Sequence, residues 1–288
     1  MTGRVVVLGS SGVIGRAVLN ALGQDDQTGQ GPVAISSRNI DLSSSGAADE
    51  LADVLIPGDS VVFLSALTPD RGRGTETLLT NLRMADAVGR VLRARAPAHL
   101  IYMSSDAVYP FGDGLVSEAS PAAPADLYGV MHRTREIIME SLGLDATLAI
   151  LRCTLVLSPD DTHNSYGPNR FRRQAESDGK IVLGGAGEEM RDHVLANDVG
   201  RLVGEVVRQR FAGVLNIASG ESHSFHDVAL MVADSMRSRP EIVSTDRTLP
   251  VTHRHFDTTS LRRAFPSFRF TPLRDAIAEV HRNLGLLV

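Results

Sequence analysis

Short apolar runs alternate with longer stretches of helical periodicity over most of the chain. Runs without polar alternation are typical of strands that are covered on both faces, as in a parallel sheet. These runs lie at Val5–Leu8, Val33–Ser36, Val61–Ser65, Leu100–Ser104, Leu148–Cys153 and Val214–Ile217. Helices are predicted between them, at Ile14–Leu22, Thr75–Ala94 and Tyr128–Leu142. The alternation of strand and helix predicts an α/β fold with a doubly wound parallel sheet.

Beyond residue 153 the pattern loosens. The segment Ser158–Asn169 is polar and contains two prolines and a glycine, which predicts a loop. A helix at Phe171–Ser177 and a short strand at Lys180–Leu183 follow, and the tail Glu241–Phe270 has no long periodic element. We therefore expect a smaller C-terminal lobe that binds substrate over the carboxyl edge of the sheet. The expected boundaries are 1–155 and 193–220 for the sheet domain and 156–192 and 221–288 for the smaller lobe.

Composition narrows the classes of function. A chain of 288 residues that is 43% hydrophobic can bury a large core, and its net charge of −5 argues against a general binder of nucleic acid or anionic membranes. The single cysteine, Cys153, excludes an intrachain disulfide and a cysteine-built metal site, which fits a reducing compartment. No signal-peptide pattern and no apolar run of about 18 residues is found. These features predict a cytoplasmic protein with no membrane or nucleic-acid partner.

Three glycines, Gly9, Gly12 and Gly15, follow the first predicted strand and open the first predicted helix. Such a loop turns sharply and brings backbone N–H groups against a pyrophosphate at a helix N-terminus, where side chains would block the approach. The spacing also fits a plain strand-to-helix turn, but its position favours a dinucleotide site in a Rossmann-like domain. The residues expected to bind the cofactor here are Gly9, Ser11, Gly12, Val13, Ile14 and Gly15.

The end of the second predicted strand carries Arg38. An acidic residue near this point would bind the 2′-hydroxyl of an adenosine ribose, whereas an arginine can receive a 2′-phosphate. Arg38 therefore favours NADP, although a solvated surface arginine is an equal alternative. Asp41, with Leu42 beside it, keeps NAD open, so the predicted cofactor is NADP or NAD.

Five further segments occur in an order that resembles one known family. They are Val61–Ala66, Ile101–Tyr109, Tyr128–His132 followed by Glu136, Met190–Val199, and Leu215–Gly220. Together they resemble the extended short-chain dehydrogenases/reductases, in the group of NAD-dependent epimerases and dehydratases that modify nucleotide-linked sugars. The resemblance implies a nucleoside-diphosphate sugar as substrate and a homodimer through paired helices. It also implies that Ser65 and Ala66 lie beside the cofactor.

The same resemblance implies a catalytic pair. Tyr128 matches the tyrosine that exchanges a proton with a sugar hydroxyl or carbonyl, and Ser105 matches the serine that holds the reacting oxygen. Family dehydratases carry an Asp-Glu pair after this serine, whereas this chain has Asp106 followed by Ala107. Elimination of water would therefore lack one of its two acid/base groups, and hydride transfer at one carbon is favoured. Asp106 is expected either to contact substrate or to cap the end of its strand, and we favour the cap.

One position departs from the family. The lysine four residues after the tyrosine, which anchors the nicotinamide ribose and lowers the tyrosine pKa, is replaced by His132. An i, i+4 spacing keeps both side chains on one helical face, but a histidine is mostly neutral at pH 7. We expect His132 to bind the ribose and support catalysis with less electrostatic help. Arg135 offers a replacement charge, although a salt link or exposure to solvent is the more common role.

The resemblance assigns the substrate diphosphate to two residues, Asn169 at a helix start and Arg191 in the fourth segment. A helix N-terminus and a planar guanidinium both suit such an anion. Leu155 stands where many relatives have an asparagine, which leaves the sugar and the base unidentified. No histidine spacing is convincing for a metal, and none is predicted.

The leading hypothesis is a 4-ketoreductase or epimerase that acts at one sugar carbon, with C4 favoured. An exchangeable NADP would favour the reductase, and a retained cofactor that returns the hydride would favour the epimerase. The alternative from another class is a non-catalytic NAD(P)-binding sensor or scaffold protein that has lost the lysine.

The histidine generates a prediction. If Tyr128 is catalytic, either activity rises with pH, because the phenolate lacks its cation, or another local charge replaces the lysine. Assaying His132→Lys across pH should show activity extending to lower pH than in the natural protein. A variant profile identical to that of the natural protein would remove this position from the chemistry.

Overall fold

A six-stranded parallel sheet forms the centre of the molecule. The computed structural model describes residues 3–24, 31–112, 114–248 and 250–287. The sheet contains β1 (Val5–Leu8), β2 (Val33–Ile35), β3 (Ser60–Phe63), β4 (His99–Ser105), β6 (Thr147–Cys153) and β10 (Gly213–Ile217). Its strand order is β10-β6-β4-β3-β1-β2, and every pairing is parallel. The predicted Rossmann-like sheet is thus confirmed, and its direction of winding reverses at β1, where such folds place their ligands.

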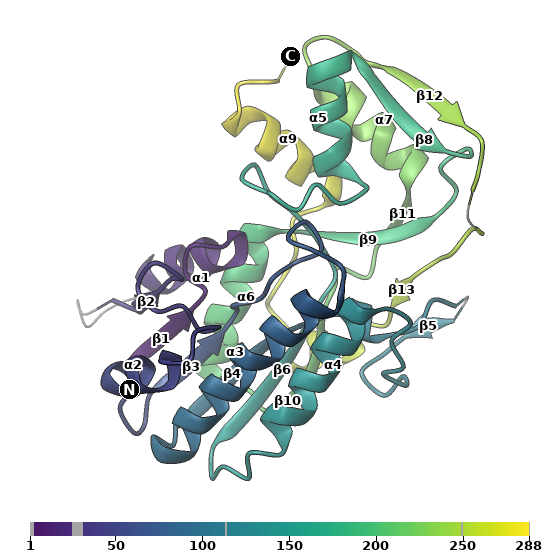
Figure 1. Ribbon diagram of the computed structural model, residues 1–288. Helices are drawn as coiled ribbons and strands as arrows, with labels where there is room; N and C mark the ends of the chain where they lie inside the picture. Colours follow the sequence, from purple (N-terminus) through teal and green to yellow (C-terminus); the bar gives the residue numbers. More distant parts are fainter. Residues whose placement is uncertain (1–2, 25–30, 113, 249, 288) are drawn as a thin grey trace.

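Helices cover both faces of this sheet (Figure 1). Val6 and Leu8 of β1 pack in a cluster with residues of α2, α3 and α4, whereas Val7 packs in a second cluster with residues of α1 and α6. The helices are α1 (Val13–Gln24), α2 (Ala47–Val54), α3 (Thr75–Ala94), α4 (Leu127–Glu140) and α6 (Ala196–Gln209). Burial on both faces explains why the strands read as unbroken apolar runs.

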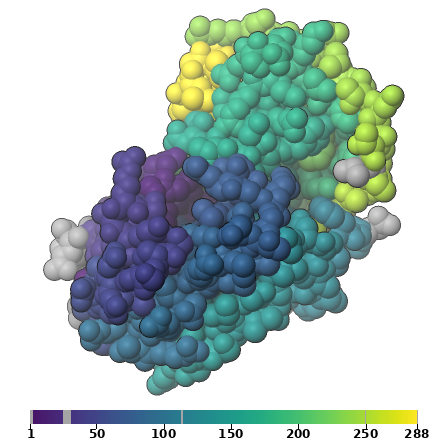
Figure 2. Space-filling view, viewed as in Figure 1, coloured from purple at the N-terminus to yellow at the C-terminus, as the bar shows by residue number. Residues whose placement is uncertain are grey.

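A second lobe lies over the carboxyl ends of the strands (Figures 1 and 2). Its core includes Phe171, Ile181, Val228 and Ile277, all of which are almost fully buried. The lobe contains β7 (Leu155–Leu157), α5 (Pro168–Asp178), β8 (Lys180–Gly184), β9 (Met190–Leu195), β11 (Ser222–Ser224), α7 (Phe225–Ser235), β12 (Glu241–Thr245) and α9 (Leu273–Asn283). Its sheets are short, with two or three strands each.

Two of the connections between the lobes are short. Only Thr154 separates β6 from β7, and α6 follows β9 directly because Leu195 ends the strand and caps the helix. Smaller elements lie near the junction: η1 (Asp106–Val108), β5 (Leu115–Val116), β13 (His255–Phe256) and α8 (Thr259–Ala264). Leu261 and Phe265 pack in the central-sheet cluster, although sequence reasoning gave residues 221–288 to the smaller lobe. Among the described residues, no helix is both long and apolar enough to cross a membrane.

The packing of α1 on α6 yields a prediction. A Cβ at Gly200 would lie 2.4 Å from the carbonyl oxygen of Ala17, so the two helix backbones touch at this point. Gly200→Ala should lower the free energy of unfolding by about 1–3 kcal/mol, because the backbones must separate. Gly23→Ala, where a Cβ meets nothing within 4 Å, should be neutral or stabilising by up to about 1 kcal/mol. Equal midpoints for both variants in urea unfolding would contradict this close contact.

Candidate active site

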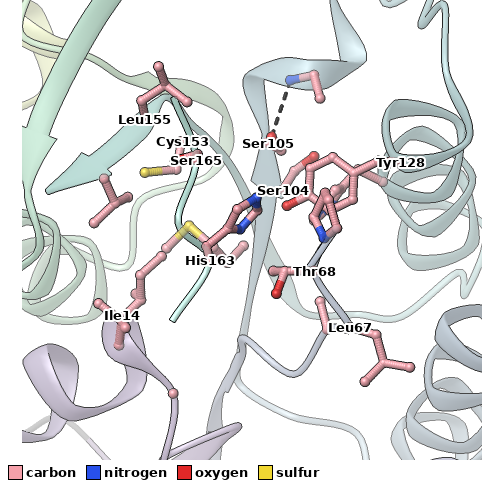
Figure 3. Close-up of a pocket in the computed structure, with 18 of the residues that line it drawn as sticks. Ile14, Leu67, Thr68, Ser104, Ser105, Tyr128, Cys153, Leu155, His163 and Ser165 are labelled. Atoms are coloured by element: carbon pink, nitrogen blue, oxygen red, sulfur yellow. Dashed lines mark hydrogen bonds between the residues drawn. The ribbon is translucent and has the colours of Figure 1, made fainter. Parts of the chain in front are cut away.

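A cavity of about 830 Å³ lies between the two lobes at the carboxyl ends of the central strands. A volume of this size is within the range of cofactor and substrate sites. Figure 3 shows part of its lining, with Ile14 and Thr68 contributed by the sheet domain and Leu155 and Ser165 by the second lobe. The predicted residues that line it are Gly9, Ser11, Gly12, Val13, Ile14, Gly15, Ser65, Ala66, Ser105, Asp106, Tyr128, His132 and Arg191.

The glycine loop is too compact for side chains. Gly9 has φ +91°, and a Cβ there would lie 2.7 Å from the backbone nitrogen of Ser65. A Cβ at Gly15 would lie 2.2 Å from the carbonyl oxygen of Gly9. Because α1 begins at Val13, the loop and the first turn of this helix, whose N–H groups have no helical partner, line one wall of the cavity.

The residues after β2 lie mostly outside the cavity. Ser37 lines it, and the neighbouring Arg38 is exposed, with no ion pair among the described residues. Asp41 accepts hydrogen bonds from the hydroxyl and the N–H of Ser43, which lower the pKa of Asp41. Leu42 is buried in the core of the sheet domain. The structure therefore does not place Asp41 or Leu42 at the cavity wall, because a local turn and the core hold them.

Ser105 and Tyr128 come from different elements that meet closely. Ser105 ends β4, and Tyr128 lies in the first turn of α4, whose cap Asp126 accepts the N–H of Gly129 at 2.8 Å. A Cβ at Gly129 would lie 2.2 Å from the carbonyl oxygen of Ala107, so only glycine lets α4 approach this closely. Figure 3 shows the Tyr128 ring reaching toward the end of β4.

A buried carboxylate fixes α4 against the sheet. Glu136 is fully buried and accepts hydrogen bonds from Ser104 at 2.6 Å and from Arg152 at 2.8 and 2.9 Å. Arg133 adds a hydrogen bond at 2.9 Å. Burial acts to raise the pKa of Glu136, but the hydrogen bonds from Arg152 and Ser104 outweigh it and hold that pKa below its ordinary value. The carboxylate is thus charged at neutral pH.

Tyr128 is a protonated phenol at neutral pH. Burial raises its pKa well above 10, and the neighbouring Ser105 side chain, which lowers it, does not compensate. Ser105 accepts the N–H of Ala107 at 3.2 Å and donates to Asp106 at 3.4 Å. The bond to Asp106 is long for an O–H donor, so the hydroxyl can exchange it for a shorter one to an oxygen in the cavity.

His132 is only 3% exposed, and it lines the cavity behind Tyr128. Its Nδ1 lies 2.9 Å from the hydroxyl of Tyr102, and its Nε2 has no partner within the described residues. The two rings of Tyr128 and His132 meet edge to face, with centroids 4.7 Å apart. Burial lowers the pKa of His132 to about 3, so the imidazole is neutral and supplies no positive charge.

Arg135 differs from the role that sequence reasoning favoured. It is fully buried and forms no ion pair within the described part of the chain, so it is neither exposed nor salt-linked. Its Nη2 donates to the carbonyl oxygen of Ser65 at 2.8 Å. The guanidinium carbon lies 4.3 Å from the ring centre of Phe63 and 5.2 Å from that of Tyr102. Cation–π contacts replace a carboxylate partner here.

Asp106 faces the cavity instead of capping its strand. Ser105 caps the start of η1, and one carboxylate oxygen of Asp106 lies 3.3 Å from the guanidinium of the buried Arg254. Burial raises the pKa of Asp106, and Arg254 and Arg191 oppose this effect. Asp106 does not cap the strand because the chain turns into η1 at this residue.

Arg191 lies across from this carboxylate on β9. It donates to the backbone of Met190 and to Thr252, and its guanidinium carbon lies 4.7 Å from the ring centre of Phe111. No described residue forms a salt bridge with Arg191 within 4.0 Å. The second lobe thus presents a positive group to the cavity.

Asn169 does not reach the cavity. Its amide donates to the carbonyl of Val156 at 2.8 Å and accepts the N–H of Ser158 at 3.2 Å, which ties the start of α5 to the loop after β7. Sequence reasoning also missed Arg254 and Phe111, which line the cavity. Both come from segments without periodicity, so no local signal marks them. No cluster of three or more potential metal ligands occurs in the described ranges.

Comparison with known proteins identifies a family whose model matches this chain. The model of the NAD dependent epimerase/dehydratase family matches residues 5–218. An ADP-L-glycero-D-manno-heptose-6-epimerase of Pseudomonas paraeruginosa (strain DSM 24068 / PA7) is 26% identical over 264 residues, which cover 81% of this chain and 78% of the relative.

Solved structures share the fold at lower identity. A UDP-N-acetylglucosamine 4-epimerase from Methanobrevibacter ruminantium M1, in complex with UDP-N-acetylmuramic acid, has a TM-score of 0.84, with 20% identity and 98% of each chain covered. A GDP-L-fucose synthetase from Naegleria fowleri bound to NADP has a TM-score of 0.81, with 18% identity, and the match covers 99% of this chain and 95% of that one. The likeness extends over both lobes.

The Glu136 network generates a prediction for stability. Glu136→Gln should lower the free energy of unfolding by about 3–5 kcal/mol at neutral pH, since it leaves the buried Arg152 without its counter-charge. Because the folded pKa of Glu136 lies below the ordinary 4.5, this contribution is complete above that value and is lost as the pH falls through the folded pKa. Unfolding measured from pH 7 to pH 3 should show the difference shrinking.

Glu140→Gln is the matched control. Glu140 also contacts Arg133, at 3.7 Å, but 44% of its side chain is exposed. Its loss should cost less than about 1 kcal/mol at any pH. A similar loss of unfolding free energy in both variants would show that the buried pair contributes no more to stability than the exposed pair.

Proposed function

Since the chain belongs to the NAD dependent epimerase/dehydratase family, we propose that it transfers hydride at one sugar carbon of a nucleoside-diphosphate sugar. The predictions of an enzyme and of NAD or NADP as its cofactor are confirmed at the level of this family. The proposed reaction is a 4-ketoreduction or an epimerisation. The feature that carries the proposal is the meeting of Ser105 and Tyr128 in a cavity that also contains the glycine loop.

The residues present fit a nicotinamide dinucleotide. The contacts at Gly9 and Gly15 leave no space for side chains, as a pyrophosphate cradle requires, and His132, a lining residue, has an unpartnered Nε2 among the described residues. Ser37 and Arg38 follow β2 where an acidic residue would select NAD, and this favours NADP. When bound, the nicotinamide supplies the hydride chemistry, taking a hydride from the sugar carbon or giving one back.

The proton chemistry belongs to Tyr128 and Ser105. When a sugar carbonyl is reduced, the phenol of Tyr128 gives its proton to the carbonyl oxygen, which becomes a hydroxyl. In the opposite direction the phenolate takes that proton, and the hydroxyl becomes a carbonyl. The Ser105 hydroxyl donates a hydrogen bond to the same oxygen and stabilises the charge that develops on it. Because burial raises the pKa of Tyr128, the phenol is protonated at neutral pH, which is the form that reduction requires, and oxidation first requires loss of this proton.

The second lobe supplies the recognition of the diphosphate. Arg191 lines the cavity without a salt-bridge partner among the described residues, and its planar fork suits phosphate oxygens. Asn169, whose amide is occupied by the backbone, is left out of the proposed contact. Asp106 and Arg254, paired beside Ser105, are placed to contact sugar hydroxyls.

The experiment is turnover with a panel of nucleotide-sugars and their 4-keto forms, followed by cofactor absorbance and product analysis. Tyr128→Phe should lower kcat/KM by at least about 100-fold while leaving the affinity for the cofactor nearly unchanged. One cofactor consumed per product identifies a reductase, and interconversion without net consumption identifies an epimerase.

Tyr166→Phe is the control. Its hydroxyl accepts the N–H of Gly184 at 3.0 Å in the second lobe, away from the cavity, so its loss should leave turnover intact. Tight cofactor binding without turnover of any nucleotide-sugar would reject the proposed function and favour a sensor.

A further inference from the structure

The family's lysine is absent, and His132 cannot supply its charge because the imidazole is neutral. Three groups nevertheless form a continuous buried unit at this place. The guanidinium of Arg135 lies on the ring of Tyr102, the hydroxyl of Tyr102 contacts Nδ1 of His132, and His132, whose buried Nε2 has no partner among the described residues, lines the cavity. This inference rests on the proposed function and concerns how its site works without a lysine.

We propose that Tyr102, His132 and Arg135 together replace the lysine. His132 offers an Nε2–H donor to a nicotinamide ribose hydroxyl, Tyr102 fixes the tautomer that provides this donor, and Arg135 supplies the positive charge that favours phenolate on Tyr128. Tyr102 and Arg135 are positioning residues, since neither touches the substrate.

The tautomer follows from counting protons. A buried tyrosine hydroxyl has one proton, and among the described residues the hydroxyl of Tyr102 has one hydrogen-bond partner, Nδ1 of His132. If Tyr102 donates this proton, Nδ1 accepts it and Nε2 carries the hydrogen, so a single N–H waits for a ligand. If Nδ1 donated instead, both the phenol proton and the Nε2 lone pair would be left unsatisfied in a buried site. The first arrangement leaves fewer polar groups unpaired and is favoured.

The cation strengthens the same arrangement. Arg135 lies over the face of the Tyr102 ring and makes its hydroxyl a stronger donor and a weaker acceptor. A guanidinium keeps its proton even when burial lowers its pKa, as here. The charge is therefore permanent, unlike that of a histidine.

The charge of Arg135 is not cancelled nearby. On α4 the adjacent Glu136 is directed to Arg152 and Arg133, and beyond β4 Asp106 is paired with Arg254. From the β3 side, the described residues that meet Arg135 are Ser65, through its carbonyl, and Phe63, through its ring. Because Ser65 lines the cavity, the guanidinium lies within hydrogen-bond distance of the cavity wall. Tyr102 and Tyr128 are the groups whose negative forms it favours.

The first test uses Tyr102→Phe and needs no turnover. Nitrogen NMR of the natural protein should show His132 as the Nε2–H tautomer, and the variant should show a mixture. Titration of NADPH by fluorescence should give a Kd raised about 3- to 10-fold in the variant, whose melting temperature should fall only as far as the loss of one buried hydrogen bond implies. An unaltered tautomer or an unaltered Kd in Tyr102→Phe would overturn the role of Tyr102.

The second test separates charge from packing. Arg135→Met should shift the rise of the oxidation rate to higher pH by about one to two units, because the phenolate loses its cation. Arg135→Lys should keep the natural profile, and adding His132→Lys to Arg135→Met should restore it by returning a cation to the site. Arg172→Met, which removes a buried arginine in the second lobe paired with Glu176, is the control and should leave the profile unchanged.

The outcomes are distinguishable from failure of the proposed function. If no nucleotide-sugar is turned over, the function fails, yet the tautomer and the cofactor affinity still decide the role of Tyr102. If turnover occurs and Arg135→Met keeps the natural pH profile, or His132→Lys does not restore it, the replacement of the lysine charge is wrong.

Discussion

The charged pair between Glu136 and Arg152 is the constraint on which the site depends. It joins α4 to β6, and the hydrogen bond from Ser104 extends it to β4. Ser104 precedes Ser105 in the strand, and Glu136 lies two helical turns from Tyr128, so one buried carboxylate sets the distance between the two hydroxyls. Removing a charge from so dry a place is costly, and this cost keeps the two elements in register.

On the neighbouring face of α4, the charge of Arg135 is buried in a different way. Arg135 has aromatic rings where Arg152 has a carboxylate, so one guanidinium is neutralised and the other is not. Two arginines on adjacent elements thus serve opposite purposes. One fixes geometry, and the other supplies an electrostatic potential behind the cavity wall.

Sequence reasoning succeeded where burial is periodic and failed where contacts are distant. The central strands were recognisable because both faces are covered, and the helix Thr75–Ala94 has its predicted bounds. The three-residue strands β7 and β11, and the buried positions of Arg135 and Asn169, depend on partners far away in the chain. The motifs identified Ser105, Tyr128 and His132, and the structure brings all three to the cavity. Arg254 also lines the cavity, but no local sequence pattern marks it.

The direct passage from β9 into α6 has a consequence for how ligands are received. Leu195 leaves no flexible residue between the strand that carries Arg191 and the helix that packs on α1, and Thr154 alone joins β6 to β7. These two direct connections restrict the movement of β7 and β9 relative to the central sheet. A shift of α6 on α1 would therefore be passed along β9 to Arg191, so the position of this guanidinium is coupled to the packing of the two helices.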